Sequence, residues 1–129
     1  MKVRTKQSAN LLYWPPRIIC IGFALFISLF ALDVFGAGYS FWETVLAFLI
    51  HQIPTALVIL VLVIAWRWEW VGGVLFAALG VFYMVSTWGR FPPSVYVTIA
   101  GPLFLMSYLF FLNWRYKDEI RVQRYGPPD

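Results

Sequence analysis

The chain has 129 residues, of which 61% are apolar and only 12% are charged, and its mean hydropathy of +0.74 predicts a membrane protein rather than a soluble domain. A single cysteine, Cys20, excludes an intramolecular disulfide and a zinc site built from several cysteines. The net charge of +4 does not indicate nucleic-acid binding, because the basic residues flank apolar runs instead of covering a soluble face.

Four apolar runs are long enough to cross a hydrocarbon core about 30 Å thick, which takes roughly 20 helical residues at ~1.5 Å each. The predicted spans are at about 17–36, 42–66, 71–88 and 94–114. The connections between them (GAGYSF, RWEW and GRFPP) are too short for a further domain, so successive helices should form tight hairpins. The sequence therefore predicts an all-α four-helix bundle of two successive hairpins. It forms one membrane domain over residues 1–129, with basic tails at 1–16 and 115–129.

Pairs of prolines precede the first and the fourth span. They are Pro15 with Pro16, and Pro92 with Pro93. Since the amide hydrogens of a helix's first turn have no acceptor within the helix, proline is tolerated there, and we expect both pairs to mark helix starts. An alternative interpretation makes residues 1–38 a cleaved signal peptide, but the apolar run exceeds the ~7–15 residues of such a signal and contains Asp33.

Lysine and arginine are distributed unevenly over the predicted tails and loops. Nine of the ten fall before the first span, between the second and third, or after the fourth, and only Arg90 falls on the other side. The positive-inside rule then places both termini in the cytoplasm. All seven tryptophans lie at predicted span ends, where indole prefers the headgroup level of the bilayer.

Four motifs along the chain resemble those of a known family. They are FALDVF at 30–35, HQIPT at 51–55, AWRWEWVGG at 65–73 and GPLFLMSYLFFLNW at 101–114. They are similar to a family of short bacterial four-helix membrane proteins known only as a domain of unknown function. The resemblance implies that fold and a bacterial inner membrane, and it brings no activity, substrate or cofactor. In that family the second motif more often reads His-Leu-Ile-Pro-Thr, so Gln52 departs from it and receives no role.

Polar residues inside a membrane are costly and so are the first candidates for function. Asp33 lies near the outer end of the first span, and the short connection brings Glu43 to about the same level. Arg90 reaches that level from the loop between the third and fourth spans. We expect these three residues to cluster at an outer mouth, either as a solvated ion group or as an entry point for a cation or amine.

His51 lies roughly 13 Å into the second span, near the bilayer midplane. Thr55 is on the same side of the helix, and Pro54 leaves the carbonyl of Ile50 without its usual amide donor. Three roles are open for His51: it hydrogen-bonds to a neighbouring helix and so fastens the bundle, it lines a proton or substrate path, or it ligates a metal or haem. We expect no metal and no cofactor, because one histidine per chain has no second ligand at i+3 or i+4.

Two further features are candidate interfaces. The first is the connection between the second and third spans, a belt of three indoles and two charges that either anchors the protein in the membrane or docks a partner or lipid headgroup. It consists of Trp66, Arg67, Trp68, Glu69 and Trp70. The second is a face of small residues on the third span, Gly73, Ala77 and Gly80. Such a face permits close helix approach, and we favour packing within the bundle over a homodimer.

The sequence contains no zinc-protease, serine-hydrolase or phosphate-loop motif. We therefore expect a non-enzymatic protein that works by self-association or as a small accessory subunit of a membrane complex. The alternative is a small oligomeric proton- or cation-coupled transporter or channel that uses the outer acidic mouth and the midplane histidine. The chain is similar in length and helix count to the small multidrug exporters. Their acidic residue lies near the middle of helix 1, however, whereas Asp33 lies towards its outer end.

Overall fold

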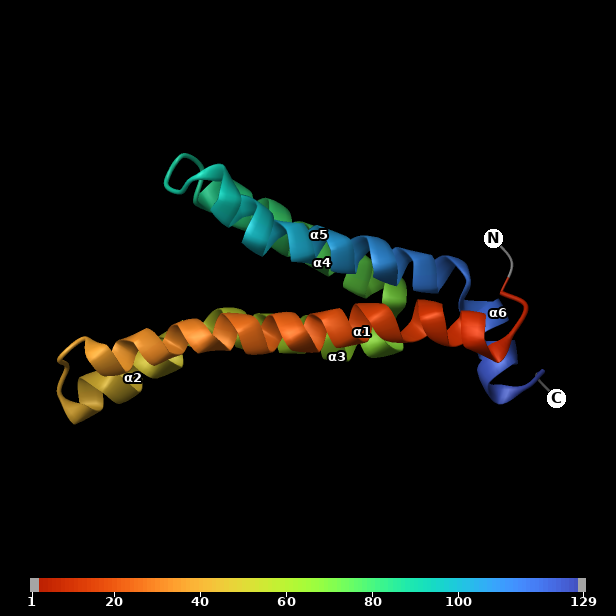
Figure 1. Ribbon diagram of the computed structural model, residues 1–129, viewed down its shortest axis with the longest axis horizontal. Coiled ribbons are helices and arrows are strands. Elements are labelled where there is room, and N and C mark those ends of the chain that lie inside the picture. The colour runs from red at the N-terminus through yellow and green to blue at the C-terminus, as the bar shows by residue number, and fades with distance from the viewer. Residues whose placement is uncertain (1–2, 128–129) are drawn as a thin grey trace.

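The computed structural model describes residues 3–127, and all regular structure in that range is helical. Four helical segments are long and apolar enough to cross a membrane: Lys6–Gly36, Phe41–Arg67, Glu69–Ser86 and Pro93–Arg115. They follow one another as two hairpins (Figure 1). The predicted all-α fold with four membrane-length helices is confirmed. The elements in chain order are α1 (Lys6–Ser28), the 3-10 helix η1 (Leu29–Gly36), α2 (Phe41–His51), α3 (Ile53–Arg67), α4 (Glu69–Ser86), α5 (Pro93–Arg115) and α6 (Lys117–Tyr125).

The first helix begins well before the predicted boundary at residue 17. It starts at Lys6 behind a cap in which the Thr5 hydroxyl oxygen accepts the Ser8 amide at 3.1 Å. Pro15 and Pro16 lie inside α1, so the expectation that this pair starts the helix is wrong. Pro16 lacks the amide that would donate to the Leu12 carbonyl, and the side-chain amide of Asn113 donates to that carbonyl instead. In contrast, Pro93 is the first residue of α5, as predicted.

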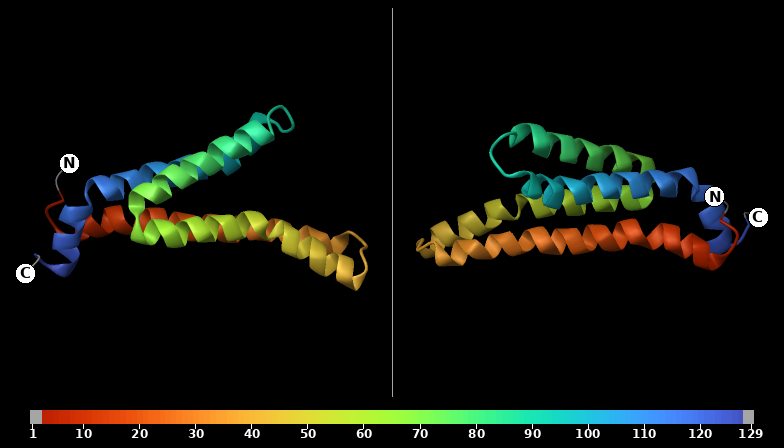
Figure 2. Two further views of the ribbon diagram at one scale, coloured as in Figure 1. Left: turned by 180° about the vertical axis from the view of Figure 1, so that it is seen from behind. Right: turned by 45° about the horizontal axis from the view of Figure 1, so that its top comes forward.

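The second predicted span is divided into α2 and α3 at Gln52. Pro54 is the second residue of α3, and because it has no amide hydrogen the α-helical ladder cannot continue across this point. The Gln52 amide donates to the carbonyls of Phe48 at 3.1 Å and Leu49 at 3.2 Å. The span therefore continues past one irregular residue and bends there (Figure 2).

The two hairpins diverge. We call α1, η1, α2 and α3 the first arm, and α4 with α5 the second arm. The arms lie against each other near the chain termini, which are at the same end of the molecule, and separate towards the hairpin tips (Figures 1 and 2). We call the end that carries residues 3–17, 66–70 and 113–127 the termini end. The first tip is 29–51 and the second tip is 85–93.

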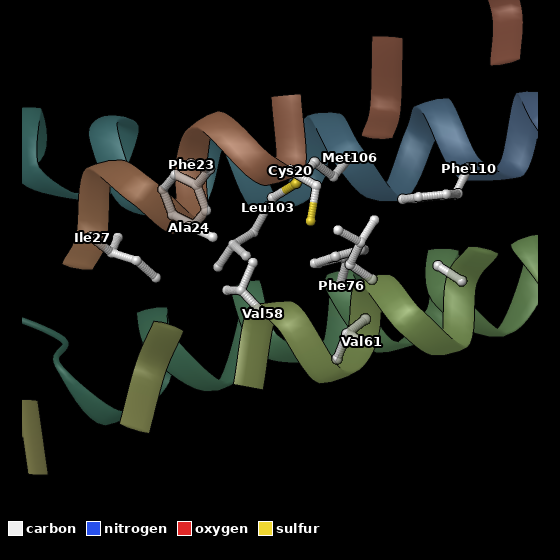
Figure 3. Close-up of a cluster of buried hydrophobic side chains, with 12 residues drawn as sticks. Cys20, Phe23, Ala24, Ile27, Val58, Val61, Phe76, Leu103, Met106 and Phe110 are labelled. Atoms are coloured by element: carbon white, nitrogen blue, oxygen red, sulfur yellow. The ribbon is translucent and has the colours of Figure 1, made fainter. Parts of the chain in front are cut away.

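The hydrophobic core lies where α1, α3, α4 and α5 converge (Figure 3). Phe76 and Phe110 are both completely buried there, and their rings stack with centroids 5.8 Å apart. The α2 helix, in contrast, has no buried residue. The bundle is thus closed at one end and open at the other. The buried members of the core are Cys20, Phe23, Ala24, Ile27, Val58, Val61, Leu62, Ala65, Phe76, Leu103, Met106 and Phe110.

The small residues of α4 are used for packing inside the chain. A side-chain carbon added at Gly73 would meet the Phe111 ring at 2.9 Å, and one added at Gly80 would meet the Phe104 ring at 2.9 Å. Gly72 likewise lies against Ala65. Glycine therefore lets α5 and α3 approach α4 closely, while Ala77 beside them is half-buried.

The segment after the fourth span folds into a short amphipathic helix, α6. Its apolar residue Ile120 is buried with Val3 and Ala9 from the start of the chain, and the Val3 amide donates to the Glu119 carboxylate at 2.9 Å. The predicted C-terminal tail is therefore folded against the beginning of α1 over its described residues.

Candidate functional site

The largest fully buried side chain is that of Arg17, a charged residue on α1 that contacts α5. Its side chain has 0% exposure. One guanidinium nitrogen, Nη1, donates to the Tyr13 carbonyl at 2.6 Å and to the Asn113 side-chain oxygen at 3.0 Å. The other, Nη2, lies 3.9 Å from the Glu69 carboxylate. Three segments distant in sequence thus meet at one buried charge.

Asn113 is the connecting residue of this arrangement. Its oxygen accepts from Arg17, and its amide nitrogen donates to the carbonyls of Leu12 and, at 3.0 Å, Leu109. One side chain therefore bonds to a buried cation, to the carbonyl that Pro16 leaves free, and to a carbonyl of its own helix. Removing it would leave unsatisfied polar groups on two helices, which is costly at low dielectric.

Aromatic rings surround the same guanidinium. The carbon at its centre lies 3.7 Å from the centroid of the Tyr13 ring, 5.1 Å from that of Trp66 and 5.5 Å from that of Phe110. Such cation–π contacts partly replace the water that a buried arginine loses. We call Arg17 with Tyr13, Trp66, Glu69 and Asn113 the arginine node.

A cavity of about 210 Å³ lies against the arginine node at the termini end. Its wall contains Tyr13, Trp66, Glu69 and Asn113 from the node, together with four basic side chains. The basic residues are Arg67 at the end of α3 and Lys117, Arg121 and Arg124 of α6. The sequence indicated Arg17, Lys117, Arg121 and Arg124 only as signals of membrane orientation, and Arg67 also as part of the belt that anchors the protein or docks a partner or lipid headgroup. Cys20 and Ala24 are buried at i+3 and i+7 from Arg17. This helical spacing puts Arg17 on the buried face of α1, and it is the sequence signal that could have predicted its burial.

The structure does not bring the three residues of the predicted outer mouth together. Asp33 and Glu43 belong to the first tip and are exposed, whereas Arg90 is exposed on the second tip, which lies away from the first (Figure 1). The expectation of a common cluster is wrong because the arms diverge. The Glu43 carboxylate instead accepts the Ser40 amide at 3.0 Å, as a helix cap does.

His51 is exposed on the first arm, and its Nδ1 lies 2.8 Å from the Ala47 carbonyl in its own helix. It does not fasten the bundle through another helix, contrary to that expectation. Thr55 is buried, and its hydroxyl has no hydrogen-bond partner among the described residues. Within the described chain, no group of three or more histidine, cysteine, aspartate or glutamate side chains could hold a metal ion.

The belt between the second and third spans contains only one residue outside the helices, Trp68. The rings of Trp66, Trp68 and Trp70 are each about half exposed, at 41%, 53% and 50%. Arg67 lies over the Trp68 ring at 5.6 Å, while Glu69 turns inwards to Arg17. The belt thus serves two purposes, because its indoles reach the surface and its carboxylate reaches the node.

Comparison with known proteins identifies the family. The family model described as Domain of unknown function (DUF7670) matches residues 4–121. The chain belongs to this family. The predicted resemblance to a family known only as a domain of unknown function is thereby confirmed. No curated protein and no solved structure matches the chain.

The region that matches DUF7670 contains the whole arginine node and most of α6. It also contains both hairpins, so the family unit is the four-helix membrane domain together with its closed end. The family description carries no activity. Function must therefore be argued from the geometry of this domain.

Proposed function

We propose that this DUF7670 protein is a non-enzymatic subunit of the bacterial cytoplasmic membrane that acts by binding another membrane protein. The observation that supports the proposal is the high exposure of the first tip. Its helix α2 has no buried residue, and its own contacts are with η1 and α3. A helix with no fully buried residue leaves most of its surface available for a partner.

Polar groups on this part of the first arm favour a protein partner over lipid alone. His51 is exposed, and the one hydrogen bond of its ring is to Ala47 on Nδ1, which leaves the second ring nitrogen for a further bond. The Thr55 hydroxyl, one helical turn away, also has no partner in the described chain, but it is buried and so is not part of this surface. Hydrocarbon tails offer no hydrogen-bonding group, whereas a neighbouring helix does.

The proposed partner is a transmembrane helix of a larger complex, and self-association is the alternative. The small-residue face of α4, a common contact in helix dimers, is already covered by α5 at Gly73 and Gly80. The transporter hypothesis lacks comparable support, because Asp33 and Arg90 lie on different tips.

The partner can be tested by gentle extraction from the native membrane and native mass spectrometry. Wild-type protein should retain a second protein at fixed stoichiometry, and His51→Ala should lose it. The matched control is Leu49→Ala, which removes a side chain that is 59% exposed on roughly the opposite face of the same helix. A clean wild-type monomer, or equal loss in both variants, would contradict the proposal, while a homodimer would assign the partner to a second copy.

Membrane orientation is a separate part of the proposal. The termini end carries the basic residues and should face the cytoplasm, so the second tip should face outwards. In intact cells of a Cys20→Ser background, a membrane-impermeant thiol reagent should label a cysteine introduced at Arg90 and not one introduced at Gln123. The opposite labelling pattern would reverse the orientation.

A further inference from the structure

The cavity at the termini end has the chemistry of an anion site. Four basic side chains line it, against a single carboxylate, that of Glu69. The carboxylate lies 3.9 Å from the buried Arg17, so its charge is largely balanced from behind the cavity wall. The basic side chains in front are not balanced in this way, because the Arg17–Glu69 pair is the one salt bridge within residues 3–127. The cavity therefore presents excess positive charge.

Unpartnered donors lie at the cavity wall and behind it. The Arg17 side chain is fully buried, and its Nε and Nη2 have no hydrogen-bond acceptor among the described residues. Arg124 lines the cavity with its Nη1 held by Asn10 and its guanidinium 4.1 Å from the Tyr13 ring centroid, while its buried Nε also has no partner in the described range. Buried arginine donors normally have acceptors, so the Nε of Arg124, a residue that lines the cavity, points to a missing acceptor group there.

The position of the cavity indicates where an anion would come from. Trp66 lines it, and the Trp66 ring meets the Trp14 ring edge to face at 6.3 Å. Half-exposed indoles mark the depth of the lipid headgroups, and Trp68 and Trp70 lie at the same end. A phosphate at that depth belongs to a phospholipid. The cavity of about 210 Å³ is much larger than the ~10–15 Å³ that one water needs on the same measure.

We propose that this cavity binds the headgroup phosphate of an anionic phospholipid. Lys117 and Arg121, which are exposed on α6, contact the phosphate from the open side, and Arg124 does so from the wall. Arginine and lysine are the usual donors to phosphate oxygens, and basic pockets between membrane helices bind such headgroups. Bound lipid would then hold α6 against the arginine node.

The test counts phospholipids retained by the full chain in native mass spectrometry, after purification in detergent with phosphatidylglycerol or phosphatidylcholine. Wild type should retain phosphatidylglycerol selectively. The double variant Lys117→Gln/Arg121→Gln should weaken this binding by about 30-fold. The matched control is Lys6→Gln/Arg115→Gln, which removes the same two charges from exposed positions near the same end that do not line the cavity, and it should bind as wild type does.

Equal weakening in both double variants would overturn the proposal, because it would mean that the lipid responds only to general surface charge. A second experiment adds inorganic phosphate at millimolar concentration, which should not displace the lipid. Displacement would overturn the lipid assignment in favour of a soluble phosphate. The outcome is independent of the proposed protein partner, since the altered residues lie at the termini end and His51 lies on the first tip.

Discussion

The termini end and the first tip are both built from apolar helices, yet they are held together differently. At the termini end the hydrogen bonds from Arg17 to Asn113 and from Asn113 to Leu12 join residues 96 and 101 positions apart. At the first tip the bonds of Glu43 and His51 join residues three and four positions apart. Since bilayer hydrocarbon is as apolar as a protein core, packing and polar bonds must hold membrane helices together. We therefore expect the end with long-range polar bonds to be the more stable part of the fold, and the first tip to be the less stable part.

The largest effect should follow from breaking the arginine node. Asn113→Ala removes an acceptor from the buried Arg17 and the donor to the Leu12 carbonyl. We expect the free energy of unfolding in detergent, measured by titration with a denaturing detergent, to fall by about 3–5 kcal/mol. Adding Arg17→Met should restore part of this loss by removing the uncompensated charge. A fall below about 1 kcal/mol would show that the node does not hold the termini end together.

A cavity in the core should cost somewhat less. Phe76 is completely buried and stacks on Phe110, so Phe76→Ala leaves a void. Such a substitution normally loses both the transfer free energy of the ring and the packing lost at the cavity. Because lipid tails are as apolar as the core, mainly the cavity contribution remains here, and we expect the free energy of unfolding to fall by about 2–3 kcal/mol in the same titration. The matched control on the same helix is Phe82→Ala, whose side chain is 71% exposed and whose loss should change stability little. Equal losses at both positions would contradict the location of the core.

Gly72 lies at a close contact between helices, whereas Gly22 lies at an open surface, so substitutions at these two positions test how closely the helices pack. A methyl group at Gly72 would collide with Ala65 of α3, whereas one at Gly22 would meet no atom within 4 Å. Gly72→Ala should destabilise the protein by about 1–2 kcal/mol through overpacking. Gly22→Ala should stabilise it by up to ~1 kcal/mol, because alanine is the better helix former. Thermal unfolding in detergent measures both changes, and a neutral Gly72→Ala would mean that α3 and α4 are less closely packed.

The smallest effect is expected at the first tip. Glu43→Gln replaces the carboxylate that accepts the Ser40 amide, so the start of α2 should lose about 0.5–1 kcal/mol. Hydrogen exchange of the α2 amides should accelerate about two- to fivefold, while global unfolding stays unchanged. A global loss as large as that of Asn113→Ala would show that the two ends are coupled, and the contrast drawn between them would fail.

The helices themselves could largely be predicted, because span length and charged ends are local properties. All four predicted spans are present, although the second is divided into α2 and α3 at Gln52. The predicted start of α1 is wrong, since Pro15 and Pro16 normally mark a helix start, and the donor that replaces the missing amide of Pro16 comes from the distant Asn113. The prediction of an outer cluster is wrong because it also depends on how distant segments are arranged. Connection lengths set the depth of Asp33, Glu43 and Arg90 but not the angle between the arms.

The amino-acid sequence by itself determined the class of protein, the number of spans and their order in two hairpins. These follow from the requirement that about 20 apolar residues cross the bilayer and that helices satisfy their own backbone bonds. Only the tertiary structure decided what Arg17 does. A charge can be buried only where acceptors and rings from several elements converge on it, and here they come from α1, α3, α4 and α5. For this reason Arg17, which the sequence indicated as a flanking charge, lies buried at the termini end.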